Sequence, residues 1–294
     1  MNDLKKIIFI TSSILDIGKS TVELLSKQMF LIVASMRNIK KNSNVERKIK
    51  NFGDNVIIKE LDVSSCISVK KEFKKILMQF SKIDVIVNNA GIKKVALAQE
   101  FVIPQLEKHM NVDYLSVTRI FKQFLPFMKK RKNSLYITIS SIPGRIVFPH
   151  LSTYNPSKFA VEELAKIYRY GFSRFKIHSV IVEPGPFVTD LNDNSPKLKD
   201  KKVLESFGEL NRAPNIAMNY YKEFMKNKPE CNPILVSDSI LKPINTDYGR
   251  GPLRTTCDID SGVNKINIQI ETYQYELSKR KWERKNLYRL NSVN

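Results

Sequence analysis

The feature that most constrains the fold of this chain is the alternation of short, continuously apolar runs with longer segments of helical periodicity. Segments such as Ile67–Phe80 place their apolar side chains on one helical face. Strands that are apolar throughout need cover on both faces, and intervening helices provide it. We therefore expect an α/β fold with a doubly wound parallel sheet. The apolar runs of strand length are Lys6–Thr11, Phe30–Ser35, Val56–Leu61, Ile83–Val87, Leu135–Ile139 and His178–Val182.

The pattern loosens after the sixth apolar run. Residues from Leu191 to about Lys228 are polar and rich in lysine, with scattered Leu, Phe and Met, and we expect them to form a helical substrate lid. A C-terminal extension of about 251–294 should follow, and residues 1–294 should form a single domain. The elements expected after the lid are a helix at Asn232–Ile244 that Pro243 interrupts late, a strand at Leu253–Asp258 and a terminal helix from Val263.

Charge and composition argue against several classes of partner. Lys plus Arg number 49 against 29 Asp plus Glu, a net charge of +20, but the lysines are spread through every expected helix, so we expect no nucleic-acid partner. No apolar run approaches the ~18 residues of a membrane span. Thr11, Ser12 and Asp16 interrupt the N-terminal apolar run too early for a signal peptide, so we expect a cytoplasmic location.

The cysteines and histidines predict no metal site. The three cysteines form no CxxC pair, and the three histidines form no HxH or HxxxH pair that would bring two imidazoles to one metal. An odd number of cysteines also argues against a disulfide framework. We expect the cysteines to be reduced.

A basic cluster near the end of the chain leaves another interpretation open. Lys279–Lys285 combines basic side chains with one aromatic residue, Trp282, as a nucleic-acid or acidic-membrane contact would. Glu276 and Glu283 interrupt the cluster, which favours a solvated helix end instead. A binding affinity that does not change with salt concentration would exclude the nucleic-acid role.

Tyr154 and Lys158 are the residues whose spacing most clearly suggests chemistry. A separation of four places both side chains on one face of a helix. Ser141 lies upstream, just after an expected strand, at the edge where a parallel sheet binds its ligands. A tyrosine hydroxyl is a poor acid or base near neutral pH until a cation stabilises the phenolate, and Lys158 can be that cation. The serine hydroxyl would hydrogen-bond a carbonyl oxygen as charge develops there.

Further motifs follow the expected strands in order. Asn88–Gly91 (NNAG) ends the fourth strand, Asn111 lies on the next helical stretch, and Pro184–Gly185 ends the sixth strand. Together with the serine and the YxxxK pair, these motifs and their spacing resemble the short-chain dehydrogenase/reductase family over essentially the whole chain. Residues 182–189 and 251–255 resemble a bacterial group of these oxidoreductases with an extended C-terminal part. The resemblance implies a Rossmann-type fold.

The resemblance also implies four catalytic residues for an enzyme that interconverts carbonyls and alcohols. Tyr154 would be the acid or base, and Lys158 would assist its ionisation and hold the nicotinamide ribose. Ser141 would orient the carbonyl, and Asn111 would fix a water that relays protons to Lys158. The hydride would come from a nicotinamide cofactor.

A set of cofactor contacts is implied by the same resemblance. Asn89–Gly91 would lie along the adenosine and its ribose, Asp62–Val63 would contact the adenine, and Pro184–Thr189 would close over the nicotinamide amide. The full set is Thr11, Ser13, Ile17, Gly18, Arg37, Asp62, Val63, Asn89, Ala90, Gly91, Tyr154, Lys158, Pro184, Gly185, Phe187 and Thr189.

The residues after the second strand favour NADP(H), with NAD(H) as the weaker alternative. A carboxylate there would bind the ribose 2′-hydroxyl of NAD, whereas a 2′-phosphate needs a cation. The chain reads Ser-Met-Arg-Asn at 35–38, and the planar guanidinium of Arg37 suits a phosphate. Ser13 and Lys40 lie near enough in sequence to assist. The alternative is that Arg37 is a solvated loop residue.

The phosphate-binding turn departs from the family pattern. The family sequence TGxxxGxG uses glycines for a tight turn and for close approach of backbone to the diphosphate. Residues 11–18 read TSSILDIG, so only Gly18 remains. A carboxylate at Asp16 would repel a diphosphate by roughly 4 kcal/mol at ~4 Å and an effective dielectric of ~20, unless it turns to solvent or caps the following helix. The second interpretation is therefore a non-catalytic binding or regulatory protein of this fold, with impaired dinucleotide binding.

The residues expected around the substrate are largely apolar, which predicts a hydrophobic ketone, aldehyde or secondary alcohol. This family usually pairs the helices that carry Asn111 and Tyr154, so the resemblance also implies a homodimer or tetramer. The substrate-pocket residues expected in addition to the lid are Ile142, Pro143, Phe148, Pro149 and Phe187.

Overall fold

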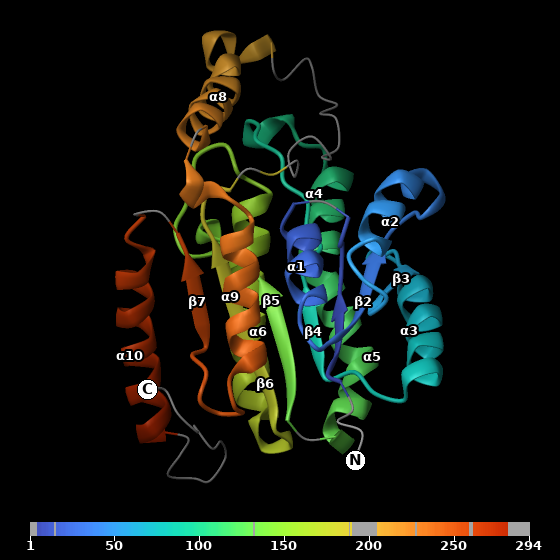
Figure 1. The fold of residues 1–294 in the computed structure, drawn as a ribbon. Helices are drawn as coiled ribbons and strands as arrows, with labels where there is room; N and C mark the ends of the chain where they lie inside the picture. The colour runs from blue at the N-terminus through green and yellow to red at the C-terminus, as the bar shows by residue number, and fades with distance from the viewer. Residues whose placement is uncertain are drawn as a thin grey trace.

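A sheet of seven parallel strands forms the centre of the molecule (Figure 1). The computed structural model describes residues 5–14, 16–131, 133–187, 189, 205–226, 228–258 and 261–281. The strand order is β3-β2-β1-β4-β5-β6-β7, which confirms the doubly wound, Rossmann-type fold. The strands are β1 (Ile7–Ile10), β2 (Leu31–Met36), β3 (Val56–Glu60), β4 (Val85–Asn88), β5 (Ser134–Ile139), β6 (Ile177–Pro184) and β7 (Arg254–Cys257).

Helices cover both faces of this sheet, as its apolar strands require. Helices α1, α2 and α9 pack on one face, and α3, α5 and α6 pack on the other. The helices are α1 (Asp16–Ser26), α2 (Ser43–Lys50), α3 (Cys66–Phe80), α4 (Ile103–Met110), α5 (Ser116–Arg131), α6 (Tyr154–Phe172), α8 (Ala213–Met225), α9 (Ile234–Asn245) and α10 (Val263–Lys281), with a π-helical turn (Asn111–Leu115) between α4 and α5. Short 3₁₀ turns lie at Lys40–Asn42, Ala98–Glu100, Ile142–Gly144, Ser173–Phe175, Gly208–Arg212 and Pro229–Cys231.

Strands β1, β2, β4, β5 and β6 supply side chains to two separate apolar cores, because successive residues point to opposite faces. In β1, Ile8 and Ile10 join the core under α1 and α9, whereas Phe9 joins the core under α3 and α5. Phe9, Phe73 and Phe124 form an aromatic cluster in the second core, with ring centroids of the last two 4.1 Å apart. This packing holds the strands in register and so sets where their carboxyl ends lie along the sheet.

The strand order reverses direction between β1 and β4, and this is where a doubly wound sheet binds ligands. The two strands lie side by side, with Phe9 opposite Ile86. Figure 1 shows α8 above the carboxyl ends of the strands, on the side where β4, β5 and β6 end. The loops that follow these strands therefore meet beneath α8.

The element boundaries differ from the sequence expectations by a few residues. Helix α9 continues through Pro243 to Asn245, and β7 is Arg254–Cys257 rather than Leu253–Asp258. Proline late in a helix removes one N–H donor without ending the helix when packing holds the next turn, and Ile244 is buried there. Helices α2 and α4 were not expected, because their short segments have little apolar periodicity.

The expected lid is only partly within the described residues. Helix α8 lies in the predicted range of 191–228, whereas residues 190–204 and 227 lie outside the described part. The basic cluster at Lys279–Lys285 falls outside it from Trp282 onward. Among the residues that the structure describes, no helix is both long and apolar enough to cross a membrane.

Candidate active site

A cavity of about 740 Å³ opens at the carboxyl ends of the strands. It is an elongated site, bounded at one end by the loops after β1 and β2 and at the other by the loops after β4 and β5 and by α8. Most residues proposed from the sequence line it. These are Ile17, Arg37, Asp62, Val63, Asn89, Ala90, Gly91, Ser141, Tyr154, Lys158, Pro184, Gly185, Phe187 and Thr189.

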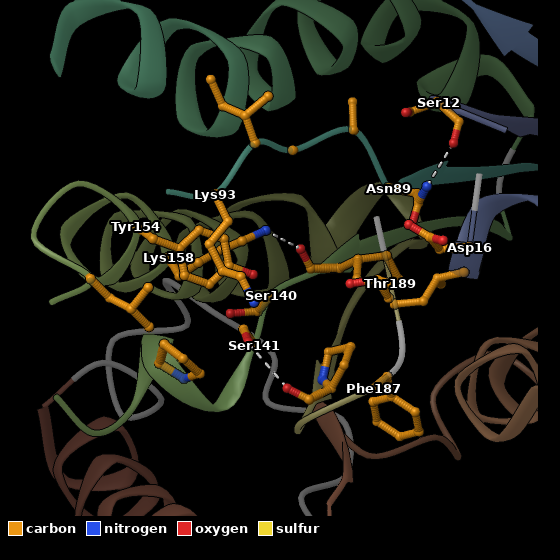
Figure 2. A pocket seen from close by; sticks show the side chains of 18 of the residues that line it. Ser12, Asp16, Asn89, Lys93, Ser140, Ser141, Tyr154, Lys158, Phe187 and Thr189 are labelled. Carbon is orange, nitrogen blue, oxygen red and sulfur yellow. Dashed lines mark hydrogen bonds between the residues drawn. The ribbon is translucent and has the colours of Figure 1, made fainter. Parts of the chain in front are cut away.

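Tyr154, Lys158 and Ser141 converge in the cavity (Figure 2). Tyr154 is the first residue of α6, and Lys158 follows one turn later, with its Nζ 5.4 Å from the centre of the tyrosine ring. The Lys158 ammonium donates a hydrogen bond to the carbonyl oxygen of Ile139, at the end of β5, over 2.9 Å. Ser141 follows the same strand, and its Oγ donates to the carbonyl oxygen of Pro184 over 3.1 Å. The end of β5 therefore holds all three groups together.

Asn111 does not join these three residues. It begins the π-helical turn and does not line the cavity. Arg119, in the first turn of α5, donates hydrogen bonds to the carbonyl oxygen of Asn111 (3.1 Å) and to its side-chain Oδ1. The Nδ2 group donates to the carbonyl oxygen of Ser64. The expected role of Asn111, to fix a water that relays protons to Lys158, stays a prediction that this arrangement does not support, because Arg119 bonds both of its oxygens.

The turn after β1 keeps a glycine-type backbone without glycines. Ser12 has φ of +54° and Asp16 has φ of +48°, in the left-handed region that side chains with a Cβ rarely adopt. Gly18 keeps its glycine for a steric reason, since a Cβ there would lie 2.2 Å from the Ser12 carbonyl oxygen. Ser12 and Asp16 also line the cavity. The chain thus preserves the shape of a phosphate-binding turn while it places a carboxylate in the turn.

Thr11, Ser13 and Gly18 shape this turn from behind rather than line the cavity. The Thr11 Oγ1 accepts hydrogen bonds from the backbone N–H groups of Asn89 (2.9 Å) and Ala90 (3.0 Å). The Ser13 Oγ donates to the Ile10 carbonyl oxygen over 3.0 Å, so it does not point toward a ligand. These three residues were expected to contact the cofactor directly, and the structure gives them a supporting role instead. Thr11 and Ser13 use their hydroxyl groups to bond buried backbone, and Gly18 leaves space for the Ser12 carbonyl oxygen.

The loop after β2 brings cations to the other end of the cavity. Arg37, Asn38 and Lys41 line it and are exposed, and the half-buried Asn42 lines it as well. The Asn38 Oδ1 accepts a hydrogen bond from the Lys41 backbone N–H over 2.9 Å, which orders this turn. No carboxylate occupies the end of β2 itself, where the sequence is Ser-Met-Arg-Asn. These residues fit an anionic group better than a neutral ribose hydroxyl.

Comparison with known proteins agrees with this geometry. Residues 6–200 match the short chain dehydrogenase family. The chain belongs to this family. The expected enzyme class, an oxidoreductase of the short-chain dehydrogenase/reductase type, is thereby confirmed.

Relatives and solved structures give the extent of the likeness. A 3-ketodihydrosphingosine reductase from Bacteroides thetaiotaomicron is 30% identical over 189 residues, which are 64% of this chain and 66% of that protein. A short-chain dehydrogenase/reductase from Burkholderia phymatum in complex with NAD has a TM-score of 0.74 at 16% identity, over 93% of this chain and 95% of its own. ElxO with NADP bound has a TM-score of 0.70 at 23% identity, over 89% and 100%. At such identities the two structures establish the fold alone.

Asp113 is a buried carboxyl group beside the family's YxxxK lysine that the sequence analysis missed. Its Oδ1 accepts a hydrogen bond from the Ile92 N–H over 2.8 Å, and its Oδ2 accepts one from the Ser157 Oγ over 2.9 Å. Burial raises the pKa of Asp113 to about 6, although the Lys158 charge and the two hydrogen bonds oppose the shift. A Cβ at Gly91 would lie 3.6 Å from Asp113 Oδ1 and 3.7 Å from Lys158 Nζ. The signal in the sequence is a charged residue within an otherwise apolar helical stretch.

Lys93 is a second missed residue of the cavity. Its Nζ lies 5.8 Å from the centre of the Tyr154 ring. Burial, followed by repulsion from Lys158, lowers the pKa of Lys93 to about 8. Lys93 lies two positions after the NNAG motif. Its place just after the end of a strand is the feature of the sequence that could have identified it as a cavity residue.

Much of the remaining wall of the cavity is apolar, although Lys108, Asp258 and Ser261 also line it. All five residues predicted from the sequence line it, and α8 closes the outer side. The rings of Phe148 and Tyr221 lie 6.3 Å apart, so α8 contacts the loop that follows Ser141. The predicted wall residues are Ile142, Pro143, Phe148, Pro149 and Phe187, and α8 contributes Ala217, Met218, Tyr220, Tyr221, Phe224 and Met225.

Proposed function

We propose that this oxidoreductase interconverts a carbonyl and an alcohol with NADP(H) as its cofactor. The observation that carries the proposal is that Tyr154, Lys158 and Ser141 meet at one end of a cavity whose other end presents Arg37 and Lys41. A proton donor, a cation and a hydroxyl around one point suit a carbonyl oxygen. Cations at the far end suit the 2′-phosphate that distinguishes NADP from NAD.

Each residue at the catalytic end has a role in the proposed reaction. The Tyr154 hydroxyl gives its proton to the carbonyl oxygen in reduction and takes it back in oxidation. The Lys158 ammonium stabilises the phenolate form, and it is held for this role by its bond to Ile139. The Ser141 Oγ turns from the Pro184 carbonyl oxygen to the substrate oxygen, which it orients. When bound, the nicotinamide cofactor supplies or accepts the hydride.

The cofactor would be held by the loops after β1, β2, β3, β4 and β6. Arg37 and Lys41 would bind the 2′-phosphate, and Asp62 with Val63 would contact the adenine. The segment from Asn89 to Gly91 would lie along the adenosine ribose. The segment that starts at Pro184 would cover the nicotinamide. Asp16 opposes this binding, because its carboxylate lines the cavity at a position where the family has glycine.

The substrate we propose is a ketone, aldehyde or secondary alcohol with an apolar body. The support is the apolar wall formed by the loop after Ser141 and by α8. The Bacteroides relative is named a 3-ketodihydrosphingosine reductase, and a ketone with a long apolar chain would fit the same wall.

The test is carbonyl reduction followed by loss of absorbance of the reduced cofactor. Wild-type protein should oxidise NADPH with an apolar ketone such as 2-octanone, and faster than NADH at equal concentrations. Tyr154→Phe should lower kcat by about 10²- to 10⁴-fold, because it removes the proton donor while the ring stays in place. Tyr170→Phe, on the same helix but away from the cavity, is the matched control. Equal rates for Tyr154→Phe and wild type would contradict the proposal.

One observation favours a second candidate, a binding or regulatory protein that no longer uses a dinucleotide. The family glycines of the turn after β1 are replaced by Ser12 and Asp16, both with φ in the left-handed region. A loop with a strained backbone and a carboxylate should bind a diphosphate weakly, because the two negative charges repel each other. The two candidates differ in one property, the affinity of the wild-type protein for NADPH.

We also propose a homodimer or tetramer in the cytoplasm. Helices α5 and α6 expose apolar side chains on their outer surfaces: Phe127 and Phe159 are each 38% exposed, and Ile167 is 62% exposed. Burying such a surface in a second copy would be favourable. All three cysteines are free thiols, which suits a reducing compartment. Sedimentation velocity of the purified protein tests the assembly.

A further inference from the structure

Lys93 places a second ammonium group beside the catalytic tyrosine. The backbone that carries it is fixed, because the N–H of Ile92 donates a hydrogen bond to Asp113 over 2.8 Å. The distances of Lys93 Nζ and Lys158 Nζ from the centre of the Tyr154 ring are similar, 5.8 Å and 5.4 Å. Figure 2 shows the three side chains together at the same end of the cavity. Two cations therefore face the point where the carbonyl would react.

The protein does not balance the charge of Lys93. Across the described parts of the chain, no carboxylate forms an ion pair with it. The neighbouring carboxyl group of Asp113 is buried and is occupied by the Ile92 N–H and the Ser157 hydroxyl. A half-buried ammonium beside another ammonium is unfavourable unless an anion joins them. An anionic group of a ligand would have room beside Lys93, because Lys93 lines the cavity.

The rest of the cavity indicates the chemical character of the ligand that would bear this anionic group. Beyond Tyr154 the wall is formed by apolar and aromatic side chains, including Ile142, Phe148 and, from α8, Phe224. A ligand that fills this space has an apolar body. The carbonyl would lie at Tyr154, and Lys93 Nζ is 5.8 Å from the centre of that ring, so an anionic group close to the carbonyl carbon can approach Lys93.

We propose that Lys93 binds a carboxylate that the substrate carries next to its carbonyl, so that this enzyme acts on 2-oxo or 3-oxo acids with an apolar tail, or on the matching hydroxy acids. The inference rests on the proposed carbonyl–alcohol activity and names the substrate class. Lys93 is the residue that determines specificity. Tyr154, Lys158 and Ser141 keep their proposed roles.

The first experiment measures binding without turnover. Octanoate has the carboxylate and the apolar tail but no reducible carbonyl, and calorimetry would follow its binding to wild type, Lys93→Met, Lys93→Arg and Lys94→Met. Lys94 is the adjacent lysine, and it does not line the cavity. Octanoate should bind Lys93→Met about 10- to 100-fold more weakly than wild type, as expected for loss of a charge-assisted hydrogen bond. Lys94→Met should match wild type, and Lys93→Arg should keep part of the affinity. Equal affinity for wild type and Lys93→Met would overturn the proposal.

The second experiment compares 2-oxooctanoate with its methyl ester as substrates, with NADPH. Lys93→Met should lower kcat/KM for the acid about 10- to 100-fold and change kcat/KM for the ester less than 3-fold. An equal loss for both substrates would show that Lys93 acts on Tyr154 and not on the carboxylate, which would overturn the proposal. If octanoate binding follows Lys93 but neither compound is reduced, the carboxylate site stands and the proposed activity fails.

A third measurement separates the substrate from the cofactor as the source of the anion. The phosphates of NADPH are also anionic and could in principle satisfy Lys93. Direct titration of wild type and Lys93→Met with NADPH should give dissociation constants within 2-fold of each other. A loss of NADPH affinity of tenfold or more in Lys93→Met would assign the lysine to the cofactor and overturn the proposal.

Discussion

Ser12 and Asp16 hold a backbone conformation that glycine adopts without strain. An L-residue in the left-handed region costs roughly 1–2 kcal/mol, and the protein accepts this at two positions of one turn. Gly18 beside them cannot change, because its Cβ would meet the Ser12 carbonyl oxygen at 2.2 Å. The turn therefore keeps the form of a phosphate-binding loop, and the substitutions alter its strain and its charge.

Replacing Ser12 by glycine should stabilise the protein. Glycine removes the strain of the left-handed φ, but it also has greater entropy in the unfolded chain. The net increase in the free energy of unfolding should be about 0.5–1 kcal/mol. Urea unfolding at equilibrium would measure it. Ser13→Gly is the control, and it should destabilise the protein because the Ser13 Oγ bond to Ile10 is lost. A Ser12→Gly variant less stable than wild type would show that the strain argument is wrong.

Asp113 should make stability depend on pH in the acidic range. Its pKa is raised by burial from 3.8 to about 6 in the folded state, so its contribution to stability is fully present below pH 4 and is lost as pH rises through 6. The difference amounts to at most about 3 kcal/mol at neutral pH. Asp113→Asn, which cannot ionise, should therefore gain stability relative to wild type between pH 4 and pH 7.5. Thermal unfolding of both proteins across this range would show it, and a constant difference would contradict the assignment.

At the scale of elements, the parts of the fold that the sequence predicts are those with strong periodicity. The six apolar runs became β1 to β6 because a strand covered on both faces is apolar throughout. Helix α2 has only eight residues, and Val45 and Ile49 are its two apolar contacts with the core, so the segment is too short for a clear periodic pattern. The π-helical turn that starts at Asn111 depends on tertiary contacts with Arg119, which sequence spacing does not show.

The convergence of Tyr154, Lys158 and Ser141 in the cavity could be predicted from the sequence, whereas the positions of Lys93 and Asp113 could not. Tyr154 and Lys158 are four apart on one helix, and Ser141 follows a strand, so spacing alone brings them to one edge. Lys93 and Asp113 come from different elements, and their approach to Lys158 depends on how the loop after β4 packs on the π-helical turn. Such contacts between elements do not follow from local patterns.

Helix α8 should determine how well long substrates bind. The Tyr221 ring lies 6.3 Å from the ring of Phe148 and lines the cavity. Tyr221→Ala should raise KM for 2-octanone about 3- to 10-fold, with kcat little changed, because an aromatic contact of roughly 0.5–1.5 kcal/mol is lost away from the reacting atoms. Ile216→Ala, at an exposed position of the same helix outside the cavity, should leave KM unchanged. An unchanged KM in Tyr221→Ala would remove α8 from the substrate site.

At the scale of the whole molecule, a buried ionic network joins the C-terminal elements to the catalytic end. Arg254 of β7 pairs with Glu162 of α6 over 2.8 Å, with Glu183 of β6 over 2.9 Å, and with Glu271 of α10. Glu162 lies one turn after Lys158, and Glu183 directly precedes Pro184. The C-terminal strand and helix therefore support the elements that carry the catalytic residues.

Removing the central cation of this network should destabilise the whole protein. Arg254→Met would remove the cation shared by three carboxyl groups, two of them fully buried, although Glu183 would keep its pair with Arg145 at 3.9 Å. The loss should cost about 3–5 kcal/mol. Arg250→Met breaks an exposed pair with Asp247 and should cost less than about 1 kcal/mol. Urea unfolding would compare the two variants. A similar small effect for both would show that the network adds little to stability.

If the cavity is a working NADP(H) site, the wild-type protein must bind NADPH. Direct titration with NADPH and NADH is the most direct test. Calorimetry should show saturable binding of NADPH and weaker binding of NADH, with the preference lost in Arg37→Ala. Asp16→Gly should strengthen NADPH binding about tenfold or more, because a carboxylate near the diphosphate is removed. If the wild type binds neither cofactor and Asp16→Gly restores binding, the protein is not an active dehydrogenase but a binding module built on the same fold.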